Sequence, residues 1–125
     1  MSASTEFTTY ILDRLHVLGP IETRRFFGGV GLLADATQFA MIMGNTVYFV
    51  VNDATRTKYE QAGMSCFSYS TKTKLVQVRR YFALPEEILE DQDALRAWAG
   101  EAMLAARKVS KPKIATRRTS LKDDA

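Results

Sequence analysis

The sequence predicts an α+β domain with two layers, in which helices cover one face of an antiparallel sheet of five strands. Three observations lead to this class. Apolar residues recur at helical spacing near both ends of the chain, strand-like runs lie between them, and tight turns rather than regular crossover helices join the runs. A chain of 125 residues with 46% hydrophobic residues has room for one such domain with its own core. The expected order is α-β-β-β-α-β-β-α.

The first element is an amphipathic helix over about residues 5–18. Its apolar stripe has the spacing of a helix that faces a core, and it consists of Phe7, Ile11, Leu15 and Leu18. Ser4 is the expected N-cap. Gly19 and Pro20 predict the end of the helix, because glycine readily leaves the helical conformation and proline cannot continue it.

Three short antiparallel strands follow as a meander, at residues 29–34, 38–43 and 46–51. We expect the first two to be joined by a turn at Asp35 and Ala36. The second and third are separated by Gly44 and Asn45, a pair that tolerates the positive φ of a tight hairpin.

A short helix and a second hairpin complete the predicted sheet. Asn52 or Asp53 caps the helix, which ends at Gly63. Residues 66–70 and 74–82 then carry side chains that alternate between the two faces of a strand. These two strands are expected to pair with each other and to join the first three.

The last helix begins at Pro85 and has a second cap at Asp91. Its inward stripe consists of Leu95, Trp98, Ala102 and either Ala105 or Ala106. Beyond Lys108 the sequence is polar, basic and without periodicity. We therefore expect one domain over residues 1–108 and a disordered tail over residues 109–125.

The net charge of +3 is distributed unevenly along the chain. Residues 107–125 hold seven Lys or Arg against two Asp, which leaves a net charge of −2 on residues 1–106. The tail is expected to be either a solubilising end, which is the favoured interpretation, or an arm that binds the phosphates of nucleic acid without sequence specificity. Its basic residues are Arg107, Lys108, Lys111, Lys113, Arg117, Arg118 and Lys122.

The composition also bears on the compartment and on catalysis. No stretch has the pattern of a secretory signal or the length of a membrane span, and the single cysteine, Cys66, cannot form an internal disulfide. We expect a cytoplasmic protein without membrane contact. Cys66 and the single histidine, His16, supply neither a metal site nor a nucleophile placed beside a base. We therefore expect no enzyme, no metal and no cofactor.

The segment RRFFGGVG at residues 24–31 is the most unusual stretch of the chain. Its glycines have neither the spacing of a dinucleotide fingerprint nor that of a P-loop, and they lead into a strand. We expect Gly28 and Gly29 to provide backbone freedom at the entry to that strand, with at least one phenylalanine ring in the core. Arg24 and Arg25 either form an anion site near the sheet edge or, as we favour, lie solvated at the surface or paired with carboxylates such as Glu22.

Four groups of residues resemble the TfoX N-terminal domain family, over about residues 7–106. They are Arg-Arg-x-Phe-Gly-Gly-x-Gly at residues 24–31, the aromatic pair Phe39 and Tyr48, Phe-x-Tyr at residues 67–69, and aromatic-x-x-Leu-Pro-Glu-Glu before the last helix. The resemblance implies a domain related to the secretion-chaperone-like fold. It also implies a role in regulating competence genes as the partner of a transcription activator.

The resemblance has two departures and one open point. A lysine that the family often carries two positions after Tyr48 is Val50 here. We expect this chain to lack the second, C-terminal domain of the full regulators. A homodimer is an open alternative, because secretion-chaperone-like folds often pair.

Two functions from different classes follow. The first is a non-enzymatic interaction module that acts through protein contacts, and its working surface consists of Arg24, Arg25, Gly28, Gly29 and Gly31. The second is a small-molecule or anion-binding domain with its pocket between the sheet and the helices, for which a deep pocket containing Arg25 and Tyr48 would be the support. An enzyme is the least favoured class.

Overall fold

The computed structural model describes residues 4–110 and confirms the predicted α+β class. Six strands form one antiparallel sheet in the order β1-β2-β3-β4-β6-β5. The strands are β1 (Glu22–Phe26), β2 (Gly29–Ala34), β3 (Thr37–Met43), β4 (Thr46–Val50), β5 (Cys66–Ser70) and β6 (Leu75–Ala83). The helices are α1 (Thr5–Leu15), α2 (Asp53–Gln61), α3 (Glu86–Glu90) and α4 (Gln92–Ser110), with a 3-10 turn, η1 (His16–Leu18), after α1.

The sheet has six strands where the sequence predicts five. The additional strand, β1, lies at the edge and pairs with β2 alone. Its first four residues, ETRR, are exposed, and none of them is apolar. Apolar alternation is the signal from which strands are predicted, and this edge strand does not carry it. Arg24 and Arg25 therefore lie on this edge strand.

The core lies between the sheet and the helices. Helix α4 packs on β3 and β4, where Phe39, Phe49 and Leu95 are almost completely buried. Helix α2 joins the same side, because the ring of Tyr59 contacts those of Phe82 on β6 and Trp98 on α4. The helices thus cover one face of the sheet, as predicted.

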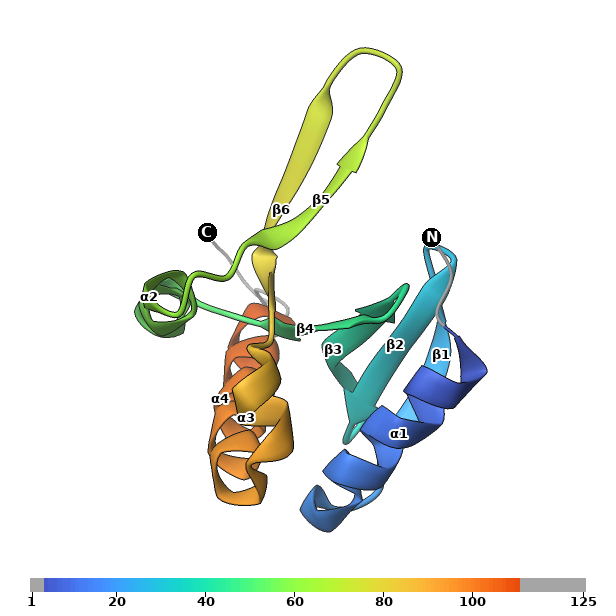
Figure 1. Ribbon diagram of the computed structural model, residues 1–125, viewed down its shortest axis with the longest axis vertical. Coiled ribbons are helices and arrows are strands. Elements are labelled where there is room, and N and C mark those ends of the chain that lie inside the picture. The colour runs from blue at the N-terminus through green and yellow to red at the C-terminus, as the bar shows by residue number, and fades with distance from the viewer. Residues whose placement is uncertain (1–3, 111–125) are drawn as a thin grey trace, which may run out of the picture.

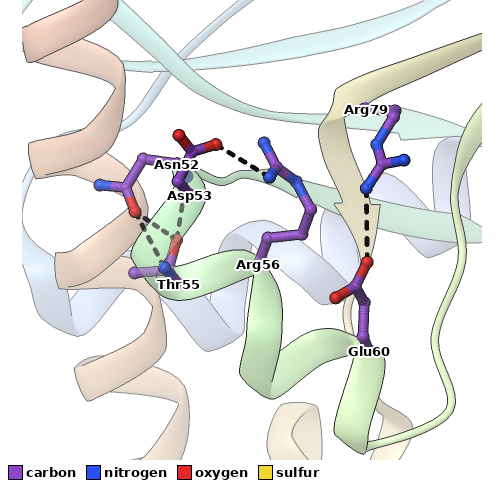
Figure 2. A network of polar contacts seen from close by, with 6 residues as sticks. All are labelled: Asn52, Asp53, Thr55, Arg56, Glu60 and Arg79. Atoms are coloured by element: carbon purple, nitrogen blue, oxygen red, sulfur yellow. Dashed lines mark hydrogen bonds and ion pairs between the residues drawn. The ribbon is translucent and has the colours of Figure 1, made fainter.

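The predicted helix caps are present. Ser4 Oγ accepts a 3.0 Å hydrogen bond from the backbone N–H of Phe7. Asn52 and Thr55 form a reciprocal capping box at the start of α2, with hydrogen bonds of 2.9 and 3.0 Å (Figure 2). Asp91 Oδ1 accepts from two backbone N–H groups at the start of α4, each at 3.1 Å. Each cap satisfies donors that the first turn of a helix leaves without partners.

The β5–β6 hairpin leaves the plane of the other strands and extends away from α3 and α4 (Figure 1). The bend coincides with an irregularity in the pairing. Cys66 lies opposite Phe82, whereas the next residue, Phe67, lies opposite Val78. Residues 79–81 of β6 therefore have no partner on β5, and a bulge of this kind bends a strand and redirects its side chains.

The end of the chain is described only in part. Helix α4 runs to Ser110, past the predicted end of the domain at residue 108. Arg107 forms an ion pair of 3.3 Å with Asp35 in the turn between β2 and β3. Five predicted tail residues lie outside the described residues: Lys111, Lys113, Arg117, Arg118 and Lys122. Within residues 4–110, no helix combines the length and apolar character that crossing a membrane requires.

Candidate functional site on the bent sheet

Two adjoining cavities open where the β5–β6 hairpin bends away from the rest of the sheet, and Phe26 and Tyr81 line both. We call the larger one, of about 650 Å³, the apolar groove; its walls include Phe26, Phe27, Phe67, Tyr69, Leu75 and Tyr81, with two methionines of β3. We call the smaller one, of about 300 Å³, the arginine cavity; its polar lining consists of Arg24, Thr37, Gln38, Arg80 and Tyr81.

Phe27 forms the exposed rim of the apolar groove. Phe26 and Gly29 are paired across β1 and β2, so Phe27 and Gly28 make a two-residue turn, with φ angles of 50° and 81°. Such turns favour glycine or asparagine, because a positive φ strains a residue with a bulky side chain. Phe27 is nevertheless 80% exposed, and its ring contacts Phe26 edge-on at a centroid distance of 4.8 Å. An exposed aromatic ring is thus held at the groove despite a backbone cost.

The arginine cavity is organised by the buried amide of Gln38. Arg24 Nε donates a 3.1 Å hydrogen bond to Gln38 Oε1. Gln38 Nε2 in turn donates a 3.1 Å hydrogen bond to the hydroxyl of Tyr81. The chain of hydrogen bonds links the edge strand β1 to β6 across β3.

Gly31 makes room for this amide. It lies directly opposite Arg24 on β2. A Cβ atom at Gly31 would lie 2.4 Å from Gln38 Oε1, closer than real Cβ atoms approach. A larger residue would therefore displace Gln38 from between Arg24 and Tyr81.

Arg80 completes the cavity from the segment of β6 that has no partner on β5. Its guanidinium carbon lies 5.9 Å from the centroid of the Tyr81 ring. Its Nε is buried and has no hydrogen-bond partner among the described residues. The ion pairs found in residues 4–110 involve neither Arg24 nor Arg80. Two guanidinium groups thus line one small cavity without a carboxylate between them.

A match to a known protein family includes all the strands that form this site. Residues 13–106 match the TfoX N-terminal domain family. The chain belongs to that family. No curated protein matches the chain.

In this TfoX N-terminal domain, the residues predicted from the Arg-Arg-x-Phe-Gly-Gly-x-Gly segment separate into different roles. Arg24 and Gly31 build the arginine cavity. Arg25 is exposed, and alternation along β1 directs it to the other face from Arg24. Gly28 supplies the positive φ of the turn. Gly29 allows a close backbone approach, because a Cβ there would lie 2.3 Å from the carbonyl oxygen of a β3 residue.

Tyr48 and Arg25 line neither cavity. Tyr48 is half-buried on β4, where its ring contacts Phe67 at a centroid distance of 5.3 Å. Burial raises the pKa of Tyr48, and the nearby thiol of Cys66 adds to the effect. Both cavities are lined by strand and turn residues and by no helix residue. Neither therefore lies between the sheet and the helices, where a pocket was predicted.

The sequence analysis chose neither Phe27, at the rim of the apolar groove, nor the polar residues Thr37, Gln38, Arg80 and Tyr81 of the arginine cavity. A signal for Gln38 was present, because it is the single amide in the run TQFAMIM. A polar side chain inside an apolar strand is expected to have a hydrogen-bond partner. Arg80 and Tyr81 gave no such signal, since their orientation depends on the bulge in β6.

Within the part of the chain that the structure describes, no group of three His, Cys, Asp or Glu side chains could hold a metal ion. The polar lining of the arginine cavity offers arginines, a hydroxyl and an amide, which are groups that bind and orient a ligand.

Proposed function

We propose that the chain is a non-enzymatic, cytoplasmic regulatory module of the TfoX type that acts by binding a protein partner in the apolar groove. The family to which it belongs supports a regulatory role. The observation that carries the proposal is Phe27, which is 80% exposed at a positive φ beside an apolar cavity. Exposed aromatic residues around an apolar depression are typical of surfaces that bind other proteins.

The partner is a segment of a transcription activator that carries an apolar side chain next to an acidic one. No acidic residue lines the groove or the arginine cavity. Arg24 and Arg80 adjoin the apolar groove, and Lys72 and Lys74 lie in the turn at the far end of the β5–β6 hairpin. An apolar surface bordered by cations complements an acidic partner in both composition and charge.

The test is cross-linking from the groove in cells. The photoreactive residue p-benzoylphenylalanine replaces Phe27 in the full chain, and the cross-linked proteins are identified by mass spectrometry. The matched control places the same residue at Leu104, which is 58% exposed on α4, away from the cavities. We expect a transcription activator to be cross-linked from position 27 and not from position 104.

Three results would overturn the proposal: no cross-linked protein from position 27, the same proteins from both positions, or a cross-link to a second copy of the chain. The last result would make the groove a homodimer contact. In a strain that lacks the chain, Phe27→Ser should fail to restore the transcript levels that the wild type restores, whereas Leu104→Ser should restore them.

The basic tail supports a second contact, with nucleic-acid phosphates. In the full chain, replacing Lys111, Lys113, Arg117 and Arg118 by alanine should weaken binding to a fluorescent duplex about tenfold or more at low salt. The variant neutralises fewer phosphates and so releases fewer of the counterions condensed on the DNA. Equal binding by the variant and the wild type would make the tail a solubilising end. The cross-link from position 27 is independent of this result.

A further inference from the structure

The arginine cavity presents hydrogen-bond donors. A guanidinium has no acceptor atom, so the contact with Arg24 fixes Gln38 Oε1 toward Arg24 and Gln38 Nε2 toward Tyr81. The hydroxyl oxygen of Tyr81 accepts from Gln38, and its own proton is left to donate elsewhere. The orientation of one amide thus makes Tyr81 a donor toward the cavity.

The two arginines add charge to these donors. Arg24 uses Nε for Gln38, and no hydrogen bond of its two terminal nitrogens is found among residues 4–110. Arg80 is partly buried, and its Nε is buried without a partner in the same part of the chain. By contrast, the neighbouring Arg79 forms an ion pair of 3.5 Å with Glu60 (Figure 2). Among residues 4–110, a carboxylate is thus paired with Arg79, and none is paired with Arg24 or Arg80.

We propose that the arginine cavity binds a carboxylate and that the apolar group carrying this carboxylate lies on Phe26 and Tyr81, the two residues shared with the apolar groove. A carboxylate has two oxygens in one plane, which suits the planar fork of one guanidinium while the second guanidinium and the Tyr81 hydroxyl approach from the side. This inference deepens the proposed function by naming the charged group, but its test requires no partner protein.

The test is a titration of the full chain followed by nuclear magnetic resonance. The probes are 3-phenylpropionate, the neutral 3-phenylpropanol, inorganic phosphate, and the blocked dipeptide N-acetyl-Phe-Glu-amide. We expect both carboxylates to shift the side-chain signals of Gln38 and the Nε–H signal of Arg80. Tighter binding of the dipeptide identifies a peptide source, and tighter binding of the free acid identifies a small metabolite; both results support the site.

The matched variants are Arg80→Gln and Arg79→Gln, which remove the same charge from adjacent positions. We expect Arg80→Gln to weaken binding of 3-phenylpropionate about tenfold, and Arg79→Gln to change it by about twofold or less. Arg24→Gln serves as a second variant if Arg80→Gln loses the dispersed spectrum of the folded chain.

The proposal is wrong if 3-phenylpropanol shifts the same signals, if phosphate binds as tightly as the carboxylates, or if the two arginine variants weaken binding equally. It also fails if neither carboxylate binds. A cross-link from position 27 in that case would leave the proposed function standing, whereas carboxylate binding without a cross-linked partner would remove the proposed function alone.

Discussion

The side chain of Gln38 donates a 3.1 Å hydrogen bond to the hydroxyl of Tyr81, although 43 positions separate the two residues in the sequence. Both residues lie beside irregularities in the sheet. The register between β2 and β3 shifts next to Gln38, and β6 has unpaired residues on its β5 side at Tyr81. Bulges redirect side chains, and two of them here bring together an amide and a phenol that regular strands would keep apart.

Replacing Gln38 by leucine should lower the free energy of unfolding by about 1–3 kcal/mol, because Arg24 Nε and the Tyr81 hydroxyl lose their partner. Tyr81→Phe should cost about 0.5–1.5 kcal/mol, since it removes one neutral hydrogen bond. Urea denaturation of both single variants and the double variant measures their coupling. Costs that simply add would show that the hydrogen bond contributes nothing to stability.

Gly31→Ala should lower the free energy of unfolding by about 1–3 kcal/mol, because the new Cβ overlaps the amide of Gln38. Gly100→Ala is the matched control. Nothing lies within 4 Å of a Cβ at Gly100, which sits inside α4. That substitution should instead stabilise the chain by about 0.5–1 kcal/mol through helix propensity. Both values come from urea denaturation, and a Gly31→Ala variant at least as stable as the wild type would contradict the close approach at Gly31.

Local sequence signals were enough to predict the elements of the core. Capping residues and apolar stripes act within a few positions, so the helices beginning after Ser4 and Asn52 were predicted with their caps. The turn at Gly44 was predicted because glycine readily adopts a positive φ, and its φ is 61° in the structure. These features depend on neighbours in the chain and not on the final packing.

The candidate site was predicted only in part, because it depends on contacts between distant strands. Arg24 and Gly31 were chosen from their unusual segment, but both act on Gln38, which lies outside that segment. Arg24 donates a hydrogen bond to its amide, and Gly31 leaves the space that the amide occupies. Arg80 and Tyr81 enter the cavity through the bulge of β6. The edge strand β1 was not predicted for a related reason. Its backbone pairs with β2, but its first four residues carry none of the apolar alternation from which strands are predicted.

Tyr59 should make the stability of the chain sensitive to alkaline pH. Burial, and then the charge of Glu101, raise the pKa of Tyr59 well above its ordinary value of 10.0. Below pH 10 the phenol is protonated in both the folded and the unfolded chain, and its contribution to stability is complete. As the pH rises above 10 toward the folded pKa, the unfolded chain loses the proton first, and the free energy of unfolding falls.

Tyr59→Phe removes this proton and should therefore lose less stability between about pH 8 and about pH 11 than the wild type does. The measurement is urea denaturation at several pH values in that interval. The difference between the two proteins at neutral pH serves as the reference, because the phenol is uncharged there in both states. Parallel curves for the two proteins would mean that Tyr59 ionises as readily in the folded chain as in the unfolded one.

Phe27→Asn should separate stability from binding. Asparagine tolerates the φ of 50° at this position better than phenylalanine does, so the substitution should raise the free energy of unfolding by about 0.5–1 kcal/mol. It also removes the exposed ring from the rim of the apolar groove, and binding of the partner identified by cross-linking should weaken about tenfold or more. The two quantities are measured by urea denaturation and by titration of the purified partner.

The control for Phe27→Asn is Val17→Asn, since Val17 is 54% exposed on η1 and lines neither cavity. It should leave partner binding unchanged. A residue selected for stability alone would fit the positive φ of this turn. A large apolar residue at such a position is therefore expected where its side chain binds another molecule. A stabilised Phe27→Asn variant that still binds the partner normally would show that the ring at the rim has no part in binding.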